Sequence, residues 1–175
     1  MAPRGATLRA VPDSIPAVPL KRVVLGLNGG SADPLVVRLG CQLVRGQRAE
    51  LIGVHVVEVD WSHDLSEDIS SGNEQAAAVL DHAEAAAENL GARLVTSLLQ
   101  ARHPGAALVD EAVALAADVV ILGLPYRTRF GGDFAIGRTV PYVFQNAPCR
   151  VLVAREQMPV ETRAQPALPA AGARG

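Results

Sequence analysis

The sequence predicts a three-layer α/β/α sandwich around a five-stranded, mainly parallel sheet with right-handed crossovers. Five short runs rich in Val, Leu and Ile alternate with segments whose apolar residues recur at helical spacing. The run at 54–59 is predominantly apolar, which is typical of a strand buried on both faces of a parallel sheet. Because only 3% of the residues are aromatic, aliphatic side chains must form the core, and such a core suits helices packed on a sheet.

The first predicted elements are a strand at 22–28 and a helix at 33–45. The strand is a short Val- and Leu-rich run that stops at the turn Asn28-Gly29-Gly30-Ser31. Ser31 can cap the helix that follows, and Pro34 is tolerated because it lies in the first helical turn. This opening is a strand followed by a helix.

The rest of the domain repeats this alternation. A longer strand at 49–60 leads through an acidic loop to a helical stripe that reaches Leu90 and stops at Gly91, a suitable left-handed end. The later elements are a strand at 93–99, a helix with Leu108, Ala112, Leu115 and Ala116 on one face, a strand at 118–124, a helix at 137–146 that Thr139 can cap, and a strand at 149–154.

Length and composition indicate one domain. The 175 residues, 49% hydrophobic and 19% charged, suffice for a single well-buried core at 20–156, between disordered tails at 1–19 and 157–175 that lack apolar periodicity. A formal net charge of −2 argues against nucleic-acid binding, which needs clustered Lys and Arg. The first twenty residues hold no signal-peptide core or membrane span, so we expect a cytoplasmic protein without direct membrane insertion. Cys41 and Cys149 are expected to be free, buried thiols.

Two glycine-rich loops mark the candidate site, because such sheets bind ligands at the C-terminal ends of their strands where the winding reverses. The loop at 123–139 combines glycines with three arginines and enters a helix N-terminus, which suits a phosphate. The alternative is a glycine loop that turns a corner among solvated arginines. The turn at 28–31 offers amide, hydroxyl and backbone donors across the same crevice, although a strand-to-helix turn uses such residues for conformation anyway.

These residues resemble the universal stress protein family over nearly all of 21–155. The resemblance rests on the turn at 28–31, on His55-Val56-Val57-Glu58, and on the segments 117–123 and 146–153. It implies the strand order 3-2-1-4-5, the fold of the adenine nucleotide alpha hydrolases, and a regulatory role in stress response or transport. The sequence of residues 124–127, 130–132 and 140–143 most resembles that of the universal-stress-type domains at the cytoplasmic ends of some amino-acid permeases. A membrane transporter is therefore one expected partner.

ATP-binding members of that family carry a G-x2-G-x9-G-[S/T] loop for the phosphates and an acidic residue after the first strand. Gly123 and Gly137 match the first and third glycines, but Tyr126 replaces the second, the spacing is one residue longer, and Asn28 stands where the acid is usual. The resemblance implies an adenine nucleotide (ATP, AMP or cyclic di-AMP), with or without Mg, and the departures leave open which one. The implied ligand-binding residues are Asn28, Gly29, Gly30, Ser31, Val57, Arg102, Gly123, Tyr126, Arg127, Arg129, Gly137, Arg138 and Thr139.

Metal and catalytic sites are not expected. The four histidines (His55, His63, His82 and His103) lack the paired short spacing of zinc sites, and the acidic loop with Asp60, Asp64, Glu67 and Asp68 lacks the spacing of a calcium loop. Ser31 lies in no nucleophile-elbow pattern. For Arg102, a solvated loop cation is the alternative to a ligand contact. We therefore predict a regulatory domain that is no enzyme, with slow ATP hydrolysis left open.

The strand order that the resemblance implies puts the last strand at an edge of the sheet, where an apolar strand invites pairing. The resemblance implies a homodimer through Val151, Leu152 and Val153. The competing function is a dimeric interaction module that has lost its nucleotide and acts on a transporter or another partner. The sequence does not separate the two.

Overall fold

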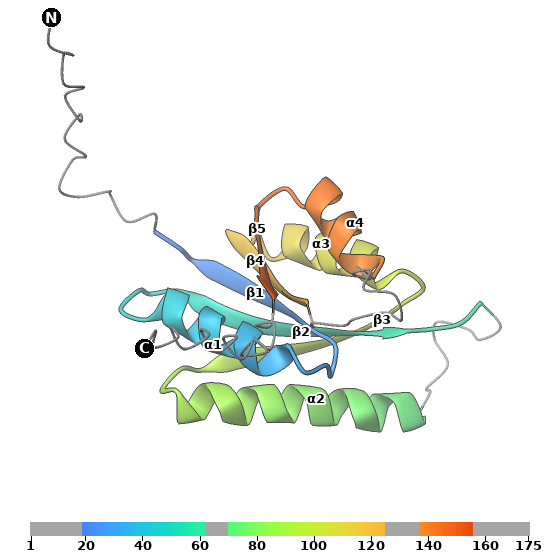
Figure 1. Ribbon diagram of the computed structural model, residues 1–175, viewed down its shortest axis with the longest axis horizontal. Coiled ribbons are helices and arrows are strands. Elements are labelled where there is room, and N and C mark those ends of the chain that lie inside the picture. The colour runs from blue at the N-terminus through green and yellow to red at the C-terminus, as the bar shows by residue number, and fades with distance from the viewer. Residues whose placement is uncertain (1–18, 62–69, 125–136, 156–175) are drawn as a thin grey trace, which may run out of the picture.

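A computed structural model of the protein describes residues 19–61, 70–124 and 137–155, which form nine elements (Figure 1). The five strands make one sheet in the order β3-β2-β1-β4-β5, in which all neighbours are parallel. The predicted fold class and strand order are thereby confirmed. The strands are β1 (Arg22–Leu27), β2 (Glu50–Glu58), β3 (Leu94–Ala101), β4 (Val119–Leu124) and β5 (Arg150–Arg155), and the helices are α1 (Asp33–Val44), α2 (Ser70–Asn89), α3 (Pro104–Ala114) and α4 (Thr139–Asn146).

The sheet is covered on both faces. Side chains alternate along a strand, so Val23 and Leu25 pack with α1 and α2, whereas Val24 between them packs with α3 and α4. All three are fully buried. Figure 1 shows the resulting layers, with α2 beneath the sheet and α3 and α4 above it. This double coverage is why the central strands β1 and β4 are almost wholly apolar rather than alternating.

Two predicted helix caps are wrong. The N-cap residue of α1 is Ala32 rather than Ser31, and the N-cap residue of α4 is Arg138, so that Thr139 is already inside the helix. Neither N-cap side chain makes a capping hydrogen bond. In α1 the nearby acceptor is Asp33, whose carboxylate turns back to the preceding loop instead of leaving that role to the Ser31 hydroxyl.

The ends of three other elements differ from, or refine, the sequence prediction. Helix α3 ends at Ala114, before the predicted Leu115 and Ala116, because Ala116 takes a left-handed conformation (φ 47°) that reverses the chain. Strand β3 reaches Ala101, since it pairs with β2 as far as Glu58. Gly91, two residues after the end of α2 at Asn89, has φ 74°, which confirms the predicted left-handed stop.

The two cysteines are free thiols, as predicted, but only Cys41 is buried. Cys149 lies just before β5 and is half-buried, so that part of the prediction is wrong. Burial raises the pKa of both thiols. None of the helices within the described ranges is long and apolar enough to cross a membrane.

Candidate functional site

The C-terminal ends of β1, β2 and β4 meet the first turns of α3 and α4 around a pocket of about 260 Å³, here called the inner pocket. Strand β1 lies between β2 and β4, so the chain winds away from it in both directions, which is where ligands bind in open α/β sheets. The described lining residues are Gly26, Leu27, Asn28, Val54, His55, Val56, Glu58, Pro104, Leu108, Leu122, Gly123, Thr139 and Val140.

Two further pockets adjoin the inner one. The outer pocket, about 490 Å³, lies over the starts of α3 and α4 and shares Glu58, Pro104 and Thr139 with the inner pocket. The Trp61 pocket, about 450 Å³, lies beyond it and shares Glu58, His103 and Arg138 with the outer pocket. Together they form a continuous crevice along the C-terminal edge of the sheet.

The beginnings of α3 and α4 supply the crevice with backbone donors. Their N-cap residues, His103 and Arg138, accept no hydrogen bond from the helix with their side chains. Pro104 and Pro141 have no N–H, and the N–H groups of Ala106 and Tyr142 already donate to the N-cap carbonyls. Among the described residues, the backbone donors left at the two helix starts are therefore those of Gly105, Thr139 and Val140. The helix dipole is positive at each of these starts. Two such ends at one crevice favour an anionic group, such as a phosphate.

The turn after β1 is held by its own side chains. The Asp33 carboxylate accepts hydrogen bonds from the backbone N–H groups of Gly29 (2.8 Å) and Asn28 (3.1 Å). The Asn28 side-chain oxygen accepts the Gly30 N–H at 2.8 Å, which leaves the amide NH₂ of Asn28 as the group that it can offer a ligand. Burial raises the pKa of Asp33 despite the two N–H donors.

His55 joins the inner pocket to the end of β1. Its Nδ1 lies 2.9 Å from the carbonyl oxygen of Leu27. A carbonyl can only accept, so this hydrogen bond assigns the proton to Nδ1 and leaves Nε2 as an acceptor in the neutral ring. His55 alternates with Val54 and Val56 along β2, so its ring lies on the face of the sheet that carries α1 and α2, and only its backbone can border the inner pocket.

Glu58 and Arg138 face each other across the crevice. Nη2 of Arg138 lies 3.2 Å from Oε1 of Glu58, which ties the end of β2 to the start of α4. Both side chains are exposed, by 53% for Glu58 and 89% for Arg138. The pair is a single contact between solvated groups, and such pairs are readily exchanged for other partners.

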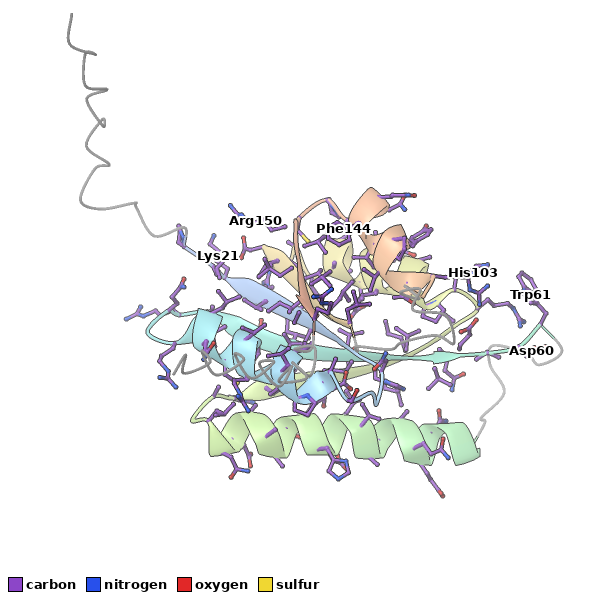
Figure 2. The ribbon with its side chains drawn as sticks, in the orientation of Figure 1. Lys21, Asp60, Trp61, His103, Phe144 and Arg150 are labelled. Carbon is purple, nitrogen blue, oxygen red and sulfur yellow. The ribbon has the colours of Figure 1, made fainter. Side chains whose placement is uncertain are left out.

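Arg102 stands in the Trp61 pocket and not in the inner pocket. Its guanidinium lies 4.7 Å from the centroid of the Trp61 ring and donates to the backbone carbonyl of Asp60. His103 meets the same ring edge-on, with centroids 6.3 Å apart. Figure 2 shows Asp60, Trp61 and His103 together at the end of the molecule opposite Lys21 and Arg150.

The predicted site residues divide into three groups. Asn28, Gly123 and Thr139 line the inner pocket, and Arg138 lines the outer one. Gly29 and Gly30 instead line a separate pocket of about 190 Å³ between α1 and α2, and Ser31 lines none of these pockets. Tyr126, Arg127 and Arg129 lie outside the described residues.

The predictions for Val57 and Gly137 depend on the backbone rather than on side chains. Val56 lines the inner pocket, and because side chains alternate along β2, the Val57 side chain points to the other face of the sheet, so only the backbone of Val57 can reach a ligand. Gly137 precedes the crevice residues of α4, and an added Cβ there would meet nothing within 4 Å. The described fold therefore does not itself require a glycine at this position.

Sequence reasoning missed His55, Glu58 and His103 as crevice residues. A usable signal existed for Glu58, because a charged residue at the C-terminal end of an apolar strand beside the switch point must face the ligand edge. Among the described residues, no group of three or more His, Cys, Asp or Glu side chains is placed to hold a metal ion.

Comparison with known proteins gives one family and many similar folds. The model of the universal stress protein family matches residues 19–155. No curated protein sequence matches the chain.

Solved structures share the fold at low sequence identity. A universal stress protein from Archaeoglobus fulgidus in complex with dAMP is 19% identical, with TM-score 0.60 and coverage of 77% of this chain and 96% of that one. A universal stress protein in complex with cAMP is 22% identical, with TM-score 0.62 and coverage of 79% and 98%. A family protein from Arabidopsis thaliana with AMP bound is 12% identical, with TM-score 0.56 and coverage of 78% and 92%.

Proposed function

The chain belongs to the universal stress protein family, and from that premise we propose that its domain binds an adenine nucleotide as a regulatory ligand in the cytoplasm. The observation that carries the proposal is the inner pocket at the switch point of the sheet, flanked by the N-termini of α3 and α4. Solved relatives hold dAMP, cAMP and AMP, which supports the same class of ligand here.

The chemistry of the crevice suits the parts of a nucleotide. Val54, Leu108 and Leu122 give the inner pocket an apolar wall for a flat base. The adjoining outer pocket begins at Arg138 and Thr139, where backbone donors and a guanidinium favour phosphate. The inner pocket alone is small for a whole nucleotide, so the ligand would extend into the outer pocket.

Gly137 supplies a direct test of the phosphate position. Its replacement by Val puts a branched side chain into space that is empty in the described fold, so the melting temperature should stay within a few degrees of wild type. Affinity should fall at least about tenfold, because one or two hydrogen bonds to a charged group are lost. Calorimetric titration of ATP, ADP, AMP and cyclic di-AMP, with melting curves in parallel, measures both quantities.

The matched control is Ala85→Val, which places the same valine side chain at an exposed position of α2. This variant should bind like wild type. If Gly137→Val binds equally well, the phosphate lies elsewhere, although the nucleotide function stands. Mass spectrometry of nucleotide released from freshly purified, denatured protein identifies the natural ligand.

The second candidate is a dimeric interaction module without nucleotide, acting on a transporter or another partner. The departures at Tyr126 and Asn28 from the family's nucleotide loops favour it. The permease-like segment lies mostly outside the described residues, so the transporter partner stays a prediction. Wild-type protein that binds none of the nucleotides at millimolar concentration would replace the first proposal by this one.

A further inference from the structure

We propose that Glu58 recognises the ribose of the bound nucleotide and that Arg138, its partner in the free protein, passes to the phosphate. The inference rests on the proposed nucleotide function and narrows it to a ligand class: ribonucleotides rather than deoxyribonucleotides. It is carried by the position of Glu58, its pairing with Arg138 and the chemistry of a carboxylate.

Glu58 lies at the junction of the crevice. It is the last residue of β2 and, among the described lining residues, the one that borders the inner, outer and Trp61 pockets alike. The inner and outer pockets hold no other carboxylate among the residues described. Glu58, Pro104 and Thr139 border both the inner and the outer pocket, and of these three Glu58 is the one with a charge to offer a ligand that spans them.

The ion pair between Glu58 and Arg138 can be replaced by contacts with a ligand. One oxygen, Oε1, contacts the guanidinium at 3.2 Å, and the pair is solvated on both sides. A carboxylate has about four acceptor positions, so a single contact uses a small part of its capacity. An exposed pair of this kind contributes little stability, and its loss is no obstacle to binding.

A carboxylate can only accept hydrogen bonds, and it repels phosphate. Glu58 therefore requires a part of the ligand that donates, and in an adenine nucleotide the donors are the adenine amine and the ribose hydroxyls. The apolar wall of the inner pocket suits the base, and the start of α4 suits the phosphate. The ribose joins base to phosphate, and Glu58 borders both pockets, so we place the sugar rather than the adenine amine beside Glu58.

The same arrangement occurs in parallel sheets that bind dinucleotides, where an acidic residue some distance after the glycine turn takes the ribose hydroxyl. Here the two groups exchange partners on binding. The ribose hydroxyls donate to Glu58, and Arg138 turns to the phosphate, so that each charge keeps a complementary neighbour.

Calorimetric titrations of AMP, 2′-deoxy-AMP, 3′-deoxy-AMP and adenosine into wild type, Glu58→Gln and Arg138→Gln test the proposal. Wild type should bind AMP at least about tenfold more tightly than a deoxy form, the value expected for one hydrogen bond to a charged group. Glu58→Gln should reduce this ratio to about threefold or less, because a neutral amide accepts more weakly. Arg138→Gln should lower the affinity ratio of AMP to adenosine and leave the ribose preference in place.

Glu50→Gln is the matched control. Glu50 lies at the opposite end of β2 and forms an exposed ion pair of the same kind, with Arg22 at 3.6 Å. It should keep both ratios, and the exposure of all these side chains should keep the melting temperatures alike.

Equal affinity of wild type for AMP and its deoxy forms would overturn the inference while leaving the nucleotide function intact. A ribose preference that survives in Glu58→Gln would also overturn it, by assigning the ribose to another residue. If no adenine compound binds wild type, the proposed function fails, and this inference fails with it.

Discussion

At the scale of single residues, the Asp33 carboxylate holds the turn that borders the crevice. Burial raises its pKa, so the folded protein binds this proton more tightly than the unfolded chain does. The Asp33 contribution to the free energy of unfolding is therefore fully present below the ordinary carboxyl pKa and is lost as pH rises through the raised value. In urea denaturation at steps from about pH 3 to 7, the free energy of unfolding of wild type minus that of Asp33→Asn should decline as pH rises.

Asp118 is a second carboxyl group, whose pKa is shifted in the opposite direction to that of Asp33. Its carboxylate accepts the backbone N–H groups of Lys21 (2.6 Å) and Arg22 (2.9 Å), and these hydrogen bonds, that of Arg22 foremost, lower its pKa. Its contribution should be present above the ordinary carboxyl pKa and be lost as pH falls through the lowered value. Asp118→Asn should remove that acid-side loss. If both variants changed the pH profile in the same direction, the assignment for Asp33 would be wrong.

Sequence reasoning singled out some residues that line the crevice, but it missed the contacts that these residues make. Asn28 and Thr139 follow from the rule that ligands meet strand ends and helix starts. Ser31 and Asp33 are both good acceptors near one turn, and no pattern tells which of them bends back to the free N–H groups. The pair of Glu58 and Arg138 joins residues 80 positions apart, so only the folded chain reveals it.

At the scale of elements, two glycines of the same loop pattern have different roles. A Cβ on Gly123 in β4 would lie 2.8 Å from the Cβ of Ala32 and 3.2 Å from Cγ2 of Val36, so α1 packs directly on this backbone. Gly123→Ala should lower the free energy of unfolding by about 1–3 kcal/mol through overpacking. Gly137→Ala should change it by less than about 0.5 kcal/mol, since its Cβ meets nothing.

Urea denaturation of both alanine variants measures this difference. Equal stability would mean that α1 can shift away from β4 without cost. The contrast also explains why a motif match alone is ambiguous: Gly123 is required by helix packing whether or not a ligand binds, whereas Gly137 has no such structural reason in the described residues.

The succession of strands and helices along the chain could be predicted from the sequence. The residues at which these elements end could be predicted less well. Alternating apolar runs and helical stripes locate every described strand and helix, because both faces of the sheet are buried. The strand order came from the family resemblance, since spacing alone allows several orders. Strand β3 was predicted too short because pairing with β2, and not an apolar pattern, carries it through Gln100.

At the scale of the whole molecule, both edges of the described sheet carry exposed apolar side chains. Leu152 on β5 is 43% exposed, and Val95 and Leu98 on β3 are each 39% exposed. Edge strands of this kind are templates for pairing with another chain. We expect β5 to be the dimer edge, as the family resemblance implies, because its centre is wholly apolar while β3 also presents Thr96 and Ser97.

A charge placed on each edge in turn decides between them. Leu152→Lys puts an ammonium group into the centre of the expected interface, where a second copy would have to desolvate it, so this variant should be a monomer at micromolar concentration. Leu98→Lys, the matched change on β3, should leave the wild-type dimer unaffected. Light scattering coupled to size exclusion reports the mass of each. The reverse result would assign the interface to β3. Dimers in both variants would exclude both sheet edges and favour the surface of α3 and α4, which presents Val113 and Phe144, each 57% exposed.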